Sequence, residues 1–273
     1  MTEKALEASS LDELEDVLSN TVVEPAINYS LSIHFPVTAS TFVMISKSEL
    51  GAALHALEIS FDPDELRDSQ KATIDTSKVS FPIMKKFQTI CQSVKSIKFS
   101  VASFPMLEEL TIEQPNNHPQ KIELDLPNLR TLHLDHIYIA DSRKFGSSLS
   151  KSPKLECFRS YKLWGLGGLP KHVIIAPKLQ DWEMQRSDDL KGLVFWAPSL
   201  AGIRFKSCSD LQVVHMMDEL PPGKWGPEYQ FNGEPTKYEV SFYCVDLPSC
   251  QGNLIRNKRC ADISDDMDDF QIF

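Results

Sequence analysis

The chain has 273 residues, of which 42% are apolar, and its 28 basic and 38 acidic residues give a net charge of −10. A general nucleic-acid binder needs a basic surface that displaces counterions from phosphates, so this balance argues against nucleic acid as a partner. No run of about 18 apolar residues occurs, and we therefore expect no membrane insertion.

Two features predict an intracellular protein, cytoplasmic or nuclear. The N-terminus is acidic and amphipathic. It lacks both the basic start and apolar stretch of a secretory signal and the acid-poor composition of a transit peptide. The six cysteines are irregularly spaced, as expected for reduced thiols inside the cell. They are Cys91, Cys157, Cys208, Cys244, Cys250 and Cys260.

Residues 1–50 are predicted to form an N-terminal cap, made of a short helix and an irregular segment. Ser10 and Glu13 have the spacing of a capping box, and the apolar residues that follow share one helical face. We therefore expect a helix over residues 10–19 that seals the first open end of a repeat array. The alternative is a docking helix for another protein.

Residues 20–90 have weaker patterns. Apolar residues alternate from Leu31 to Phe35, which is typical of a strand. A Leu-x-x-Leu-x-Ile pattern begins at Leu54 and a Val-x-x-Ile-x-Phe pattern at Val94, and both match the repeat described next without its proline. The second lies too close to the equivalent positions of the following unit to be a whole repeat, and we interpret this segment as an irregular joint.

Between residues 104 and 205 the chain contains one pattern five times: an apolar or small residue, a proline, a leucine two positions on, then two more apolar residues. The copies read F-P-M-L-E-E-L-T-I, L-P-N-L-R-T-L-H-L, S-P-K-L-E-C-F-R-S, A-P-K-L-Q-D-W-E-M and A-P-S-L-A-G-I-R-F. Their prolines are Pro105, Pro127, Pro153, Pro177 and Pro198. A repeat of this length predicts a solenoid, in which each unit buries its apolar face against its neighbours. We assign the repeats to residues 51–205.

Each copy is expected to form a strand whose side chains alternate between the core and the surface. The leucine and the residues three and five positions after it point inward, as Leu129, Leu132 and Leu134 illustrate. A second apolar group upstream of three prolines is predicted to line the core behind the strand: Ile122 with Leu124, Val173 to Ile175, and Leu193 to Phe195.

The outward residues of the five strands are predicted to form two columns across the sheet. The first column contains Thr111, His133, Arg159, Glu183 and Arg204, and the second contains Glu113, Asp135, Tyr161, Gln185 and Lys206. Over the first three copies the charge passes from acidic toward basic, and Arg159 and Tyr161 are residue types common at interface hot spots. We predict that these ten residues contact a protein partner; the alternative is the ordinary mixture of an exposed sheet.

The C-terminal part loses the period. Residues 206–260 contain a Leu-Pro-Pro-Gly break, an alternating segment and a degraded echo of the repeat, and we assign them to a closing unit. Residues 261–273 form an acidic tail in which five aspartates are interspersed with apolar residues. Such a tail either binds a partner or is simply solvated.

The segments L-P-N-L-R-T-L-H-L-D-H-I-Y-I and S-L-S-K-S-P-K-L-E-C-F resemble the leucine-rich repeats of F-box proteins, particularly the plant-type ones. The resemblance covers roughly residues 104–205. It implies an α/β fold: a leucine-rich-repeat solenoid with a curved parallel sheet on the concave face, which binds another macromolecule. An F-box usually opens with leucine-proline and continues through several apolar helical turns, and residues 1–50 depart from that pattern.

No motif in the sequence predicts catalysis or a cofactor. His133, Asp135 and His136 lie close together, but the two histidines do not share a strand face, so exposed polar residues explain them better than a metal site. The cysteines lack the paired spacing of a zinc site. The glycines of residues 164–170 lack the spacing of a phosphate-binding loop, and no G-x-S-x-G turn occurs.

We therefore expect a non-catalytic interaction module or scaffold that binds a protein partner. One alternative is a substrate-receptor adaptor that contacts ubiquitin-ligase subunits through a diverged docking segment in residues 1–50. The other is a structural subunit of a large assembly.

Overall fold

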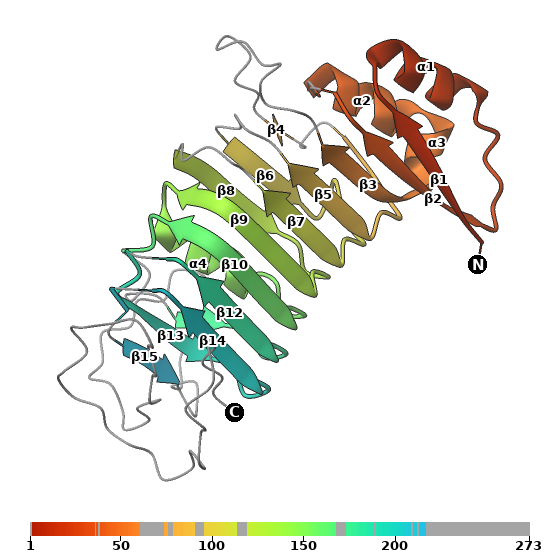
Figure 1. The fold of residues 1–273 in the computed structure, drawn as a ribbon. Coiled ribbons are helices and arrows are strands. Elements are labelled where there is room, and N and C mark those ends of the chain that lie inside the picture. Colours follow the sequence, from red (N-terminus) through yellow and green to blue (C-terminus); the bar gives the residue numbers. More distant parts are fainter. Residues whose placement is uncertain are drawn as a thin grey trace, which may run out of the picture.

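The computed structural model has an α/β fold dominated by one large parallel sheet (Figure 1). It describes residues 2–35, 37, 39–60, 74–75, 79–90, 96–113, 119–167, 173–187, 189–208, 210–211 and 213–216. The main path of the sheet runs through β1 (Thr2–Ala8), β2 (Ile27–Ile33), β3 (Leu54–Ser60), β5 (Lys86–Ile90), β7 (Glu109–Glu113), β9 (Thr131–Ile139), β10 (Cys157–Trp164), β12 (Asp181–Gln185) and β14 (Gly202–Lys206). Each strand pairs in parallel with the next on this path, so the chain adds its strands in order and in one direction.

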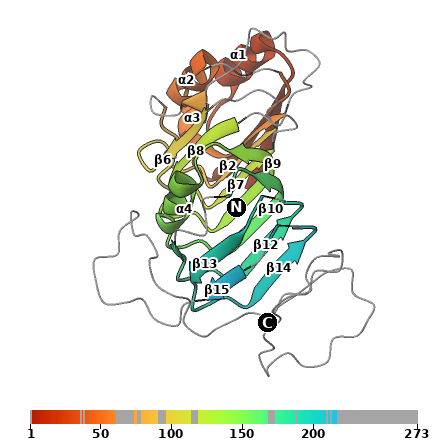
Figure 2. The same ribbon diagram turned by 90° about the vertical axis from the view of Figure 1, so that its left-hand side faces the viewer.

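The remaining strands form a second row behind this path. One group is β4 (Ile74–Asp75), β6 (Ser96–Ser100) and β8 (Pro119–Asp125), and the other is β11 (Val173–Ile175), β13 (Gly192–Trp196) and β15 (Val213–Met216). Helix α4 (Ser142–Ser150) contacts β8 and β11 and lies on the same side of the main sheet as β13 (Figure 2).

Helix α4 accepts one backbone hydrogen bond from each of the two strands beside it. The amide of Leu124 in β8 donates to Ser148 Oγ at 3.2 Å, and the amide of Ile175 in β11 donates to Ser150 Oγ at 3.0 Å. Buried backbone donors need such partners. Because the two serines supply them, a helix can replace a strand at this place in the second row.

The core lies between the two rows. Leu132 and Leu134, predicted to point inward, are 0% exposed. Trp182 of β12 stacks on Phe158 of β10 with ring centroids 4.0 Å apart and meets Phe195 of β13 at 4.7 Å. Each fully buried side chain of this size stabilises the fold by about 2 kcal/mol, so this layer is the main source of stability.

The same hydrogen-bonded turn precedes six strands of the main path. In each turn the residue two positions after the proline donates its amide to the carbonyl of the residue before that proline: Met84 to Phe81, Leu107 to Phe104, Leu129 to Leu126, Leu155 to Ser152, Leu179 to Ala176 and Leu200 to Ala197. Proline suits the second position of a turn because its φ is already fixed there and no donor is needed. The proline-leucine spacing in the sequence is therefore the spacing of a turn.

A backbone carbonyl just after each of the first five turns joins consecutive copies. The carbonyl of Arg130, for example, accepts from the amides of both Glu156 and Cys157, at 2.8 and 2.9 Å. The carbonyls of Lys85, Glu108, Glu156 and Gln180 accept two amides of the next copy in the same way. These bonds hold successive copies at a constant offset.

The structure corrects the prediction for residues 80–100. The turn at Pro82 is one more copy, directly before the one at Pro105, and sequence reasoning missed it because methionine replaces the leucine and threonine the last apolar residue. Val94 lies outside the described residues, but the other two members of its pattern do not form an irregular joint, because Ile97 and Phe99 pair in register with Ile122 and Leu124. Ile97 and Phe99 belong to β6 in the second row and take the upstream place of the copy at Pro105.

At the N-terminus, helix α1 (Leu11–Asn20) confirms the predicted helix, and Ser10 Oγ accepts from the amide of Glu13 at 3.2 Å. Helices α2 (Ala39–Lys47) and α3 (Glu49–Ala53) follow β2. The alternation from Leu31 belongs to β2, as predicted. Because β1 and β2 pair with each other and β2 pairs with β3, the main sheet begins well before residue 51.

Among the helices in the described ranges, none has the length and apolar composition needed to cross a membrane. Most of the predicted closing unit and the whole acidic tail lie outside the described residues, as do Cys91, Cys244, Cys250 and Cys260.

Candidate interaction surface

The ten residues predicted to share a surface lie together on the outward side of five adjacent strands. In the first column, Thr111 pairs with His133, His133 with Arg159, Arg159 with Glu183, and Glu183 with Arg204. The second column follows the same registers through Glu113, Asp135, Tyr161, Gln185 and Lys206. All ten are at least partly exposed. Their placement is confirmed, and their role in binding stays a prediction.

Glu183 links the two arginines of the first column. Its Oε2 lies 3.8 Å from Nε of Arg159 and 3.4 Å from a terminal nitrogen of Arg204, and its Oε1 accepts from Gln185 Nε2 at 2.6 Å. The Arg159 side chain remains 59% exposed and that of Arg204 37% exposed. Both guanidinium groups therefore keep donors available for a partner, because each has five and Glu183 engages few of them.

Basic groups gather around Tyr161 from three neighbouring copies. The ring of His136 meets the Tyr161 ring edge-on at 5.4 Å between centroids. Lys162 Nζ and Arg186 Cζ each lie 5.4 Å from the centre of the Tyr161 ring. We call these four residues the Tyr161 cluster. A cation over an aromatic face is held by the quadrupole of the ring, so Tyr161 attracts both cations.

The three basic members of the cluster share one backbone conformation. His136, Lys162 and Arg186 have φ of 53°, 51° and 55°, and each directly follows a second-column residue. The left-handed turn therefore recurs at the same place in consecutive copies and brings the three side chains to the same part of the surface. Sequence reasoning missed Lys162 and Arg186; their signal is a basic residue repeated one position after the second column.

Asp135 and His136 contact each other at the edge of the cluster. Asp135 Oδ1 and His136 Nδ1 lie 2.6 Å apart and both atoms are buried. In the described part of the chain, no group of three or more His, Cys, Asp or Glu side chains is placed to hold a metal ion.

The outward face changes sign along the sheet. On the strands β9 to β14 and at Arg186 directly after β12, which we call the basic half, the described Lys and Arg side chains outnumber the carboxylates: Arg159, Lys162, Arg186, Arg204 and Lys206 against Asp135, Asp181 and Glu183. On β1 to β7, the acidic half, the outward positions include Glu7, Glu58, Glu109 and Glu113, together with Lys86. Lys86 is paired with Glu109 at 3.0 Å.

Cys157 lies beside the first column and is half-buried on the outward side of β10, between Thr131 and Asp181. Burial raises the pKa of the Cys157 thiol above its ordinary value. The positive charge of Arg159 opposes this rise, while the negative charges of Asp181 and Glu183 add to it. The thiol therefore stays protonated at neutral pH and is a poor nucleophile.

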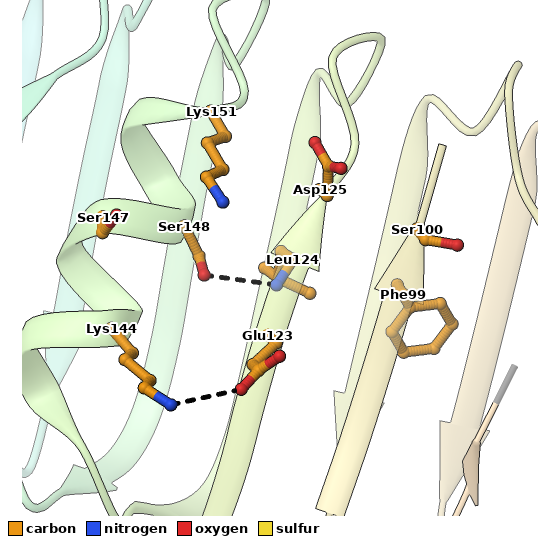
Figure 3. Close-up of a pocket in the computed structure, with 9 residues that line it drawn as sticks. All are labelled: Phe99, Ser100, Glu123, Leu124, Asp125, Lys144, Ser147, Ser148 and Lys151. Carbon is orange, nitrogen blue, oxygen red and sulfur yellow. Dashed lines mark hydrogen bonds and ion pairs between the residues drawn. The ribbon is translucent and has the colours of Figure 1, made fainter. Parts of the chain in front are cut away.

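A pocket of about 410 Å³ lies on the other side of the sheet, between α4 and β8 (Figure 3). Lys144 Nζ lies 3.6 Å from Glu123 Oε1 across it, and Ser148 is engaged by the amide of Leu124. Lysines and carboxylates balance in its wall, which consists of Phe99, Ser100, Glu123, Leu124, Asp125, Lys144, Ser147, Ser148 and Lys151. No sequence motif pointed to this pocket, because its polar residues come from segments that are far apart in the chain, at α4 and in the strands β6 and β8.

No protein-family model, curated protein or solved structure matches the chain. Its function is therefore inferred from the geometry of the sheet face.

Proposed function

We propose that the chain is a leucine-rich-repeat protein whose repeats form a solenoid, with the outward columns on its concave face. Six Pro-x-Leu or Pro-x-Met turns with the same hydrogen bond, which recur from Pro82 to Pro198, support this assignment. So does the parallel sheet, to which the chain adds its strands in sequence order. In a solenoid each unit contacts only its neighbours, which fits the bonds between consecutive copies.

Its function is non-catalytic, intracellular protein binding: an interaction module or scaffold whose partner lies across the two columns. The observation that carries this proposal is the register, which aligns ten polar or aromatic side chains across five adjacent strands. Such a surface is fixed before binding, so a partner meets little of the ordering cost that a flexible binder incurs. Arg159, Tyr161 and Arg204 are the expected anchors, since Arg and Tyr are enriched in hot spots.

Affinity purification from the native cell tests this function. The full chain is compared with the variant Arg159→Ala, Tyr161→Ala, Arg204→Ala and with a matched control from the acidic half, Glu58→Ala, Lys86→Ala, Gln88→Ala. We expect a stoichiometric protein partner that the first variant loses and the control retains. Both variants keep the unfolding temperature, because exposed side chains contribute little to stability.

A partner set unchanged by the first variant contradicts the proposal. Ubiquitin-ligase scaffold subunits in that set would support the adaptor alternative instead. Failure of the chain to remain soluble when it is made alone would support the structural-subunit alternative.

A further inference from the structure

The Tyr161 cluster contains two cations, Lys162 and Arg186, that form no ion pair with a carboxylate of the described residues. Both cations instead contact the Tyr161 ring at 5.4 Å. Other basic side chains along the main sheet form ion pairs with carboxylates. Arg130 pairs with Glu156 at 2.7 Å, and Lys86 pairs with Glu109 at 3.0 Å.

Two cations that share one aromatic ring repel each other, and an anion between them would remove that repulsion. The ring itself offsets only part of the repulsion, since a cation–π contact at an exposed site is weak. A carboxylate placed there meets Lys162 and Arg186 together and can accept charge-assisted hydrogen bonds from both. The cluster therefore has the chemistry of an anion site.

The size of the basic half limits the length of an anionic ligand. Its four strands, β9 to β14, span about 14 Å at the usual spacing of about 4.8 Å, which an extended peptide crosses in about four residues. Beyond β9 the acidic half presents Glu109 and Glu113, and the whole chain carries a charge of −10. A long polyanion such as a nucleic acid is repelled there, whereas a short acidic segment is not.

We propose that the Tyr161 cluster, flanked by Arg159 and Arg204, binds a short acidic segment of a partner protein in extended form. This inference depends on the proposed function, because it names the chemistry of the partner on the same surface. Lys162 and Arg186 meet the carboxylates, and the exposed part of the Tyr161 ring contacts the side chain between them.

Fluorescence anisotropy with the full chain tests the inference. The probe is a labelled peptide of about four alternating Asp and Glu residues between Gly-Ser flanks, the length that the strand spacing sets. We expect the double variant Lys162→Ala, Arg186→Ala to weaken binding by about tenfold for each cation removed. The matched control, Lys85→Ala, Lys86→Ala, removes two lysines from the acidic half and changes affinity by less than about twofold.

Several results would overturn the inference. They are unchanged binding by the Lys162→Ala, Arg186→Ala variant, equal binding of the same peptide with Asn and Gln in place of Asp and Glu, and tighter binding of a single-stranded oligonucleotide of equal charge. A thermal melt checks that the variant is folded. If it is not, the pair Lys162→Gln, Arg186→Gln retains a long polar side chain at each position and is used instead.

The acidic tail of the chain itself is the competing occupant. In a further variant the five tail aspartates, Asp262, Asp265, Asp266, Asp268 and Asp269, are replaced by Asn. Unchanged peptide affinity in that variant supports a partner segment. A gain of about tenfold assigns the cluster to the tail, because an internal competitor at millimolar effective concentration would have been removed.

The two proposals fail separately. If Arg159→Ala, Tyr161→Ala, Arg204→Ala loses its native partner but the acidic peptide does not bind the full chain, the proposed function stands and this inference falls. If the peptide binds through Lys162 and Arg186 while the native partner set is unchanged, the acidic site stands and the proposed partner surface is wrong.

Discussion

The acidic and basic halves of the main sheet have the same architecture beneath and opposite charge above. Under both halves, inward side chains such as Leu57 in β3 and Trp182 in β12 are 1% exposed. Above them, the acidic half presents Glu58 and Glu109 and the basic half presents Arg159 and Arg204. Since the core is equivalent in both, packing does not dictate the outward residues. The change of charge between the two halves is therefore a property of the surface alone. We expect substitutions in the core and substitutions on the surface to have independent effects.

The largest effect is expected in the shared core. Replacing Trp182 by Ala removes the stack on Phe158 and the contact with Phe195, and we expect the free energy of unfolding to fall by about 4 kcal/mol. Leu57→Ala, at the equivalent inward position of the acidic half, should cost about 3 kcal/mol. Denaturant titration measures both. A loss below about 1 kcal/mol in either half would break the equivalence of the two cores.

The next effect belongs to the turn after β10. Gly165 has φ of 79°, and a Cβ there would collide with the carbonyl oxygen of Ile139 in the adjacent copy. We expect Gly165→Ala to lower the free energy of unfolding by more than about 2 kcal/mol. Gly167 is the control, because among the described residues a Cβ there meets only Asp189 O at 3.9 Å, and Gly167→Ala should change stability by less than about 0.5 kcal/mol. Equal effects at the two glycines would contradict the close approach of β9 to this turn.

A smaller effect with a distinctive sign is expected at Glu183. Glu183→Gln removes the negative charge between Arg159 and Arg204, so both arginines become available and the acidic probe peptide should bind about threefold more tightly. Stability should fall by less than about 1 kcal/mol, because the two ion pairs are partly exposed. Glu58→Gln, on the same column in the acidic half, should leave peptide affinity unchanged. Weaker binding by Glu183→Gln would show that the carboxylate helps the partner to bind.

The smallest effect concerns the chemistry of Cys157. Because burial raises its pKa, its thiolate is scarcer than that of a free cysteine at pH 8, and alkylation by iodoacetamide should be slower than that of glutathione. Arg159→Ala removes the charge that favours the thiolate and should slow the reaction further. Peptide mapping by mass spectrometry separates Cys157 from the other cysteines. Faster labelling in that variant would mean that Arg159 shields the thiol sterically.

The sequence predicted the parts of this fold that repeat. The spacing of Pro127 and Leu129 recurs because it is a hydrogen-bonded turn, and the alternation after it separates core from surface. The two columns followed from that alternation without knowledge of neighbouring strands. The parallel register could be anticipated because each copy begins with the same turn. Each strand therefore starts at the equivalent residue of its copy, and neighbouring strands align.

Elements without a repeated signal could not be predicted. Strands β1 and β2 lack the proline turn, so nothing in the sequence joined residues 2–8 to the sheet. The role of Ile97 depended on its pairing with Ile122 in the next strand of the second row, which local spacing does not reveal. The Tyr161 cluster depends on a left-handed backbone conformation at Lys162 and Arg186. Lysine and arginine do not favour that conformation, so the sequence does not predict it.

The left-handed residues His136 in β9, Lys162 in β10 and Arg186 directly after β12 have a consequence for engineering and for selection. Lys162 and Arg186 hold φ of 51° and 55°, a conformation that glycine adopts freely and that costs other residues about 1 kcal/mol each. Glycine at these sites would make the protein more stable and would delete the cations around Tyr161. If the cluster binds a partner, the chain retains a less stable backbone at these positions because the cations are needed on the surface. A screen for thermostability alone would therefore select against partner binding.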